Sequence, residues 1–201
     1  MRLIKGLIMV IGVIGAMVIV ALIIGYYLYS LSPRIQEKVI PVAVSADAAQ
    51  SFDQKLDALE SQIKAAVDAG ENKQVSLVIT ESEINSKLVQ MLAEGELSLL
   101  KRVSINFCDG YFLTYAVVNT PGIDAKTGSM GRVEIIEGEP EVVIDEFNLG
   151  KLPLPKSVNR RVEQLMNIIV SLQLPEVPLD ITGVEIKNHE LTVTGTTKTT
   201  K

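Results

Sequence analysis

The feature that most constrains this chain is an uncharged run near its N-terminus. No charged residue lies between Lys5 and Arg34, and residues 7–31 are almost wholly apolar. About 20 apolar residues in a helix span a bilayer core, whereas a secretory signal peptide has a shorter run followed by a small-residue cleavage site. This run ends in three tyrosines, which suit the membrane interface. The sequence predicts an uncleaved cytoplasmic tip and transmembrane anchor over residues 1–31, with cleavage near residues 43–45 as the alternative.

The flanking charges predict the orientation of this anchor. Arg2 and Lys5 precede the apolar run with no acid beside them, whereas the cations that follow it are accompanied by Glu37 and Asp47. The positive-inside rule then places the N-terminus in the cytoplasm. We therefore expect a single-pass protein of the cell membrane whose main domain is extracytoplasmic.

Three further observations limit the partners of the chain. Gly12 and Ala16 form a small-xxx-small pair that allows a homodimer, although small residues also occur in any membrane helix. The net charge is −5, and because residues 1–31 contribute +2, the outer part carries −7, which argues against nucleic acid as a partner. Cys108 is the only cysteine, so no intramolecular disulfide and no cysteine-based metal site is expected.

Beyond the anchor, the chain reads as a stalk, one domain and a short tail. Residues 32–50 contain Pro33 and Pro41 and predict a flexible stalk, although residues 39–44 could instead join a sheet edge. Residues 51–195 form the predicted domain, and residues 196–201 a disordered tail.

Hydrophobic periodicity within the domain predicts helices and antiparallel strands in alternation. Thr80 and Glu83 have capping-box spacing, and Asp109-Gly110 is a hairpin turn. The predicted helices cover residues 51–70, 81–94 and 157–172, and the predicted strands cover residues 75–79, 103–107, 111–118, 132–136, 141–147, 184–186 and 191–193. Residues 119–131 are predicted to form a polar loop, and the chain from Thr194 onward is predicted to fray. The pattern indicates an α+β domain, with amphipathic helices packed on a curved antiparallel sheet.

Catalytic motifs are missing from the sequence. It has no nucleophile elbow, no phosphate-binding loop and no paired histidines at metal spacing. The single histidine, His189, falls in a predicted turn, and Cys108 is expected to be a small apolar residue at a strand end. We therefore predict no catalytic residue, no metal site and no cofactor, and expect that the protein is not an enzyme.

Aliphatic stripes on two predicted helices are the first candidate site. A sheet that wraps such helices can leave an apolar groove suited to an acyl chain, although the same stripes can simply close a core. The predicted groove residues are Ile84, Leu88, Leu92, Leu165 and Ile169.

A basic loop is the second candidate site. Lys151, Lys156, Arg160 and Arg161 lie around Leu152 and Leu154, and the helix dipole disfavours cations at the start of the predicted third helix. A basic rim beside apolar residues suits contact with anionic phospholipid headgroups. The alternative is exposed pairing with nearby acids. These acids are Glu134, Glu137, Glu139, Glu141, Asp145 and Glu146.

Residues 76–195 resemble a family of bacterial envelope proteins. The stretch Ser76-Leu-Val-Ile-Thr-Glu-Ser-Glu-Ile-Asn85 resembles the opening of LmeA-like and YpmS-like proteins, a strand followed by [ST]-x-x-E-[ILV]-N. Phe147-Asn-Leu-Gly-Lys-Leu-Pro-Leu-Pro155, the amphipathic segment after it and the closing hairpin resemble the second half of that family. The resemblance implies a fold similar to the tubular lipid-binding superfamily, in which a curved sheet wraps a long helix around acyl chains. It supplies no functional residue.

These observations together predict a non-enzymatic, membrane-anchored extracytoplasmic domain. We expect it to bind or shield phospholipid in the cell envelope. The alternative is a membrane-tethered scaffold or accessory subunit of an envelope complex, with no lipid ligand.

Overall fold

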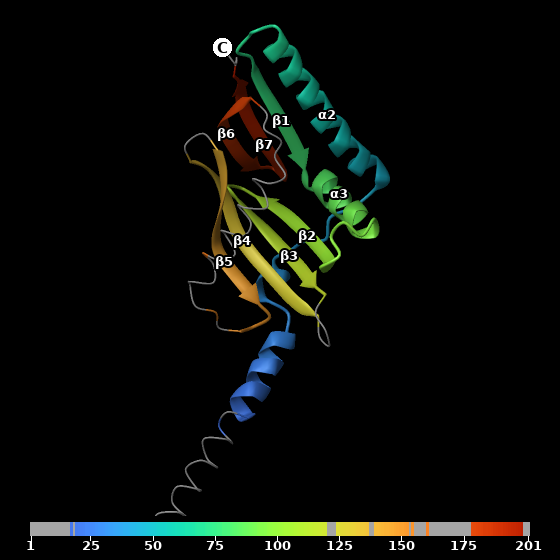
Figure 1. Cartoon of the computed structure of the whole chain (residues 1–201). Coiled ribbons are helices and arrows are strands. Elements are labelled where there is room, and N and C mark those ends of the chain that lie inside the picture. Colours follow the sequence, from blue (N-terminus) through green and yellow to red (C-terminus); the bar gives the residue numbers. More distant parts are fainter. Residues whose placement is uncertain are drawn as a thin grey trace, which may run out of the picture.

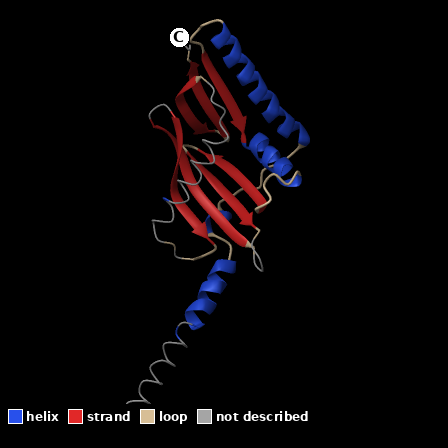
Figure 2. Cartoon of the chain, viewed as in Figure 1, coloured by secondary structure: helices blue, strands red, loops and turns tan. Residues whose placement is uncertain are grey.

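The computed structural model describes residues 17, 19–119, 124–136, 139–152, 154, 160 and 178–198. In this part the chain is α+β and contains two antiparallel sheets (Figures 1 and 2). The elements are a short 3-10 helix η1 (Arg34–Glu37), α2 (Ala46–Asp68), β1 (Gln74–Thr80), α3 (Glu81–Ala93), β2 (Leu100–Cys108), β3 (Tyr111–Val118), β4 (Ala125–Ile136), β5 (Glu139–Leu149), β6 (Leu179–Lys187) and β7 (Glu190–Thr197). Residues 19–30 are also helical.

The two sheets replace the single curved sheet that the sequence predicts. One sheet has the strand order β1-β7-β6 and the other β2-β3-β4-β5. β1 pairs with β7 over its whole length, with Val78 opposite Thr192. The strands divide into two sheets because α3 follows β1 directly and leads the chain from the first sheet to β2, which starts the second sheet. Figure 1 shows the four-stranded sheet between the N-terminal helix and the three-stranded sheet, with α2 along β1.

The predicted start of the first domain helix is wrong by several residues. α2 begins at Ala46, because the Ser45 side chain caps it by accepting a hydrogen bond from the Ala48 N–H at 3.1 Å. Ser51 lies inside the helix instead, where its hydroxyl donates to Glu83 Oε1 at 2.6 Å. The capping box at the start of α3 is confirmed, since Thr80 and Glu83 exchange both of its hydrogen bonds.

The predicted polar loop at residues 119–131 is mostly strand, because β4 already begins at Ala125. The glycines in this stretch do not indicate a loop. They allow other segments to approach the strand closely. A Cβ at Gly131 would lie 2.5 Å from the Val143 carbonyl oxygen and 2.9 Å from Phe112 Cζ. At these distances only glycine fits, so the missing hydrophobic alternation results from packing.

The C-terminal end of the sheet is also longer than predicted. β7 continues to Thr197, which is 2% exposed. The Thr197 hydroxyl donates to the Glu71 carbonyl at 2.9 Å and accepts from the Lys73 N–H at 2.8 Å. The prediction of fraying from Thr194 is therefore wrong for residues 194–197.

The N-terminal helix carries apolar side chains on its surface. Residues 19, 20, 22–24, 26 and 27 are all more than half exposed and are all apolar or tyrosine. Among the described residues, no helix has both the length and the apolar character needed to cross a membrane. The remainder of the predicted anchor, including Gly12 and Ala16, lies outside the described residues.

Candidate functional site

One face of the four-stranded sheet is largely apolar, with Thr114, Thr127 and Ser129 as its polar members. Phe107 of β2 lies opposite Phe112 of β3, which lies opposite Gly131 of β4, and directly opposed residues share a face. We call this the apolar face. Its other large members are Val103, Ile105, Val118, Val133, Ile135, Val142, Ile144, Phe147 and Leu149.

The apolar face is closed at one end and more accessible at the other. Phe107 and Phe112 are buried in a cluster with Val142, Ile144 and Ile186, where the β6–β7 hairpin packs on the sheet. At the opposite end, where β3 and β5 finish and β4 begins, the large residues are only half-buried. These half-buried residues are Val103, Val118, Phe147 and Leu149. The face therefore forms an apolar track that leads away from the core.

The other face of this sheet is covered by the N-terminal segment. Ile35 in η1 is 1% exposed, and a Cβ added at Gly128 of β4 would lie 3.0 Å from the Ile35 Cβ. Tyr115 and Leu113 are buried on this same face, and burial raises the pKa of the Tyr115 hydroxyl. Apolar residues are thus buried on both faces of the sheet, and the predicted stalk supplies part of that burial.

Side-chain hydrogen bonds hold the rest of this segment against the domain. The Asn106 side chain accepts from the Ile40 N–H at 2.9 Å and donates to the Ile40 carbonyl at 3.0 Å. The Ser82 hydroxyl donates to the Ala43 carbonyl at 2.8 Å, and the Ser86 hydroxyl accepts from the Ser45 N–H at 3.0 Å. Residues 40–45 therefore lie along β2 and α3, which is closer to the alternative of a sheet-edge segment than to a free tether.

The stretch that resembles the family opening makes internal contacts. The Asn85 side chain accepts from the Ile105 N–H at 2.9 Å and donates to the Ile105 carbonyl at 2.7 Å, so it occupies the free edge of β2. Glu81 accepts from the Phe107 N–H one step further along the same edge. Edge strands left unpaired invite association with other chains, and these side chains occupy the edge groups of Ile105 and Phe107.

Glu83 joins the same stretch to α2. Burial alone would raise its pKa, but hydrogen bonds from Lys55, Ser51 and Thr80 outweigh that effect and lower the pKa from 4.5 to about 2. Lys55 Nζ lies 2.8 Å from the Glu83 carboxylate, whose side chain is 8% exposed. The carboxylate is therefore stabilised in its charged form in the folded protein.

This arrangement predicts a pH-dependent contribution of Glu83 to stability. Because the folded pKa is depressed, the contribution is present above pH 4.5 and is lost as the pH falls toward 2. Glu83→Gln keeps the shape of the capping residue but cannot ionise. We expect the variant to be less stable by about 3 kcal/mol at neutral pH, and the difference to shrink toward zero as the pH approaches 2. Urea unfolding of both proteins across this range measures it, and a constant difference would contradict the assignment.

The structure places only part of the predicted groove. Ile84 packs against the core cluster, and Leu88 and Leu92 are half-buried on α3. Leu165 and Ile169 lie outside the described residues. The apolar face of the sheet was not predicted as a site. The alternation of apolar and polar residues in β2 and β5 could have indicated it.

The basic loop is also described in part. Lys151 and Arg160 are exposed and Leu152 and Leu154 are half-buried, whereas Lys156 and Arg161 lie outside the described residues. Of the acids proposed as alternative partners, Glu134 and Asp145 form ion pairs with Arg132. Within the described part, neither Lys151 nor Arg160 forms a salt bridge.

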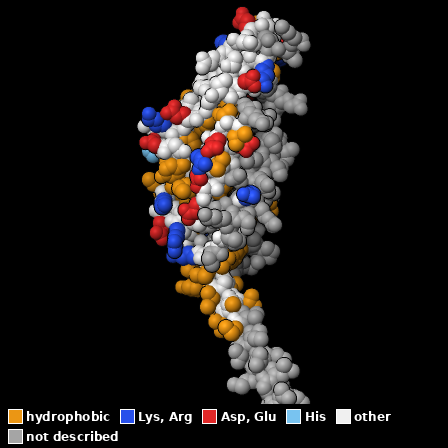
Figure 3. Space-filling model, turned by 90° about the vertical axis from the view of Figure 1, so that its left-hand side faces the viewer, with side chains coloured by type: hydrophobic (Ala, Val, Ile, Leu, Met, Phe, Trp, Pro, Cys, Tyr) orange, Lys and Arg blue, Asp and Glu red, His pale blue; other side chains and the backbone are white. Residues whose placement is uncertain are grey.

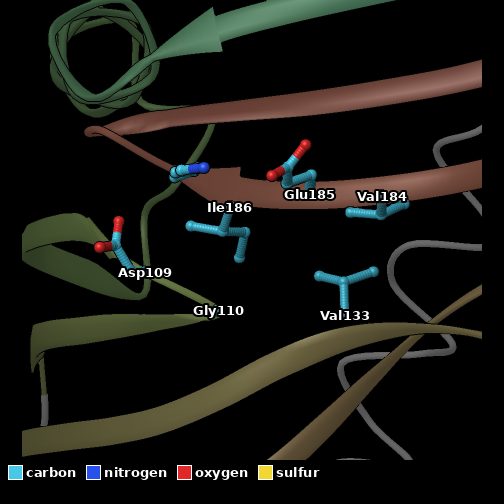
Figure 4. A pocket seen from close by; sticks show the side chains of 7 residues that line it. Asp109, Gly110, Val133, Val184, Glu185 and Ile186 are labelled. Atoms are coloured by element: carbon cyan, nitrogen blue, oxygen red, sulfur yellow. The ribbon is translucent and has the colours of Figure 1, made fainter.

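Two small pockets lie near the closed end of the apolar face. One, of about 310 Å³, lies between the Asp109-Gly110 turn and β6, and Figure 4 shows Ile186 and Val133 entering it from opposite sides. The second, of about 340 Å³, is lined by Cys108 and by His189, whose Nδ1 lies 3.1 Å from Glu81 Oε1. In the described residues, no group of three or more His, Cys, Asp or Glu side chains could hold a metal ion.

Comparison with known proteins adds no relative to this picture. No protein-family model, no curated protein and no solved structure matches the chain.

Proposed function

We propose that this protein is a membrane-anchored, extracytoplasmic, non-enzymatic domain that binds or shields the acyl chains of phospholipid. The observation that carries the proposal is the apolar face of the four-stranded sheet. Its half-buried residues extend from the core cluster to the sheet end beside helix 19–30. Acyl chains need an apolar surface of this kind, with few polar groups along it.

Two sequence features support the proposal. The uncharged run between Lys5 and Arg34 is long enough for a transmembrane anchor, and the described part of this run has exposed apolar side chains. The resemblance of residues 76–195 to LmeA-like and YpmS-like envelope proteins implies phospholipid binding. The predicted groove and basic loop belong to the same proposal.

A membrane-tethered scaffold without a lipid ligand is the second candidate. The observation that favours it is the closed end of the apolar face, where Phe107, Phe112 and Ile186 are all buried. The two small pockets lie near this closed end, and each is near the lower limit of ligand-site volumes.

Photocrosslinking with the full-length protein separates these candidates. In proteoliposomes that contain a phospholipid with a diazirine on its acyl chain, we expect label in peptides of β2–β5 as well as in the anchor. Phe147→Gln places an amide on the apolar face and should lower the sheet label by about ten-fold relative to the anchor label, since an unpaired polar group costs roughly 1–3 kcal/mol. The anchor label is the internal standard.

Val143→Gln is the matched control for this experiment. Val143 lies opposite Arg132 on the other face of β5 and is half-buried like Phe147. We expect this variant to keep the wild-type labelling. If the wild-type sheet takes up no label and Phe147→Gln only lowers the melting temperature, the scaffold replaces the lipid-binding domain.

A further inference from the structure

The N-terminal helix is joined to one end of the four-stranded sheet by backbone contacts. The Lys151 N–H donates to the Leu28 carbonyl at 2.8 Å, and the Gly150 N–H donates to the Lys126 carbonyl at 2.8 Å. Gly150 has φ +57°, and a Cβ there would lie 2.5 Å from the carbonyl oxygens of both Leu28 and Tyr29. Only glycine combines this backbone conformation with such a close approach. The helix end is therefore held against the corner where β4 starts and β5 finishes.

The same end of the sheet carries an exposed leucine and lysines. Leu99, just before β2, is 73% exposed, although its carbonyl accepts a hydrogen bond from the Asn119 N–H at 2.8 Å. Lys101, Lys126 and Lys151 lie at this end too, and of these three only Lys101 forms a salt bridge within the described residues, with Asp124. Figure 3 shows Lys and Arg side chains above the apolar helix, with Asp and Glu side chains beside them. Glu96 and Asp124 also lie at this end, but Lys126 and Lys151 form no salt bridge within the described residues. An exposed aliphatic side chain beside such lysines suits an anionic phospholipid surface.

We infer that this sheet end, defined by Leu99, Lys101, Lys126 and Lys151, rests on the anionic phospholipid headgroups of the leaflet from which the anchor emerges. The inference rests on the anchor of the proposed function. Tyr26 and Tyr27 lie one to three residues before the junction at Leu28 and Tyr29, so these tyrosines of the membrane interface are within about 5 Å of the sheet end along the helix axis. Lysine side chains at the junction reach headgroups at that height.

Two separated contacts fix how the domain sits on the membrane. Leu99 stands at the β2 corner and the helix joins at the β4–β5 corner, two to three strands or about 10–15 Å away. A helix contact alone would let the domain pivot, whereas the added Leu99 corner holds the sheet end flat against the surface. The half-buried end of the apolar face, with Val118 and Leu149, then opens at the leaflet. A lipid reaches it without passing through water.

A single tryptophan tests this contact, because the chain contains none. Leu99→Trp is made in the full-length protein and reconstituted into vesicles of phosphatidylglycerol and phosphatidylcholine with a spin-label quencher on some headgroups. We expect strong quenching and blue-shifted emission. Leu56→Trp on α2, also at an exposed leucine, is the control and should be unquenched, because α2 packs on the three-stranded sheet away from the helix junction. Equal quenching of the two tryptophans would overturn the inference.

Two further arms identify the contact. Vesicles of phosphatidylcholine alone should quench the Leu99→Trp variant less, and equal quenching in both compositions would exclude the lysines. Adding Gly150→Val to this variant should also reduce the quenching, because the helix end can no longer approach the sheet. Carbonate washing distinguishes failure of this inference from failure of the proposed function. If the Leu99→Trp protein stays in the membrane but its emission is unquenched, only this inference is contradicted. If the wash releases the protein, the anchor and the proposed function are contradicted as well.

Discussion

Replacing Ile35 by alanine is expected to lower the free energy of unfolding by about 2–4 kcal/mol. Ile35 is 1% exposed and packs on Gly128, so its truncation leaves a cavity between η1 and the sheet. A residue in a flexible stalk would give no such loss. Chemical unfolding of the full-length protein in detergent, followed by circular dichroism, measures the effect.

Ile40→Ala is the matched control, since it makes the same chemical change in the same segment. Ile40 is 65% exposed, and its contacts with Asn106 use backbone atoms only. We expect a change within about 0.5 kcal/mol. If the two alanine variants are equally stable, the N-terminal segment is a tether and not a part of the domain. If Ile35→Ala alone is destabilised, any soluble fragment that begins after η1 should be correspondingly weak.

Replacing Asn85 by leucine is expected to cost about 3 kcal/mol, because the Ile105 N–H and carbonyl lose their side-chain partner at once and the Glu81 carbonyl keeps only its helical partner. The Asn85 side chain is bonded to the Ile105 N–H and carbonyl and to the Glu81 carbonyl, and the residue is 3% exposed. Leucine has nearly the same volume but satisfies none of these groups. Urea unfolding of the variant and the wild type measures the difference.

The control for Asn85→Leu lies further along α3. The Gln90 side chain donates only to Glu94 at the surface, so Gln90→Leu should change stability by less than about 0.5 kcal/mol. Asn85→Leu also uncovers the edge of β2, and we expect concentration-dependent oligomers of this variant in size-exclusion chromatography. A monomeric Asn85→Leu protein of wild-type stability would show that Asn85 does not protect the edge.

The parts of this fold that were predictable from the sequence are those determined by near neighbours. The capping box of Thr80 and Glu83 starts α3, and the Asp109-Gly110 turn joins β2 to β3, as predicted. A capping residue and its N–H partner are three residues apart, so the local sequence is enough to predict their hydrogen bond. The apolar alternation in β2 and β5 likewise predicted strands.

Contacts between distant segments were decided only by the tertiary structure. Nothing near Ile35 in the sequence indicates that it packs on Gly128, and nothing near β1 selects β7 as its partner. The first half of β4 was predicted to be a loop because it contains Gly128 and Gly131. In a sequence, a glycine required by close packing cannot be distinguished from a glycine required by a turn. The candidate site follows the same division. Its apolar residues were visible in the sequence. Only strand register gathers them on one face, whose half-buried end lies beside the N-terminal helix, because register depends on partners far along the chain.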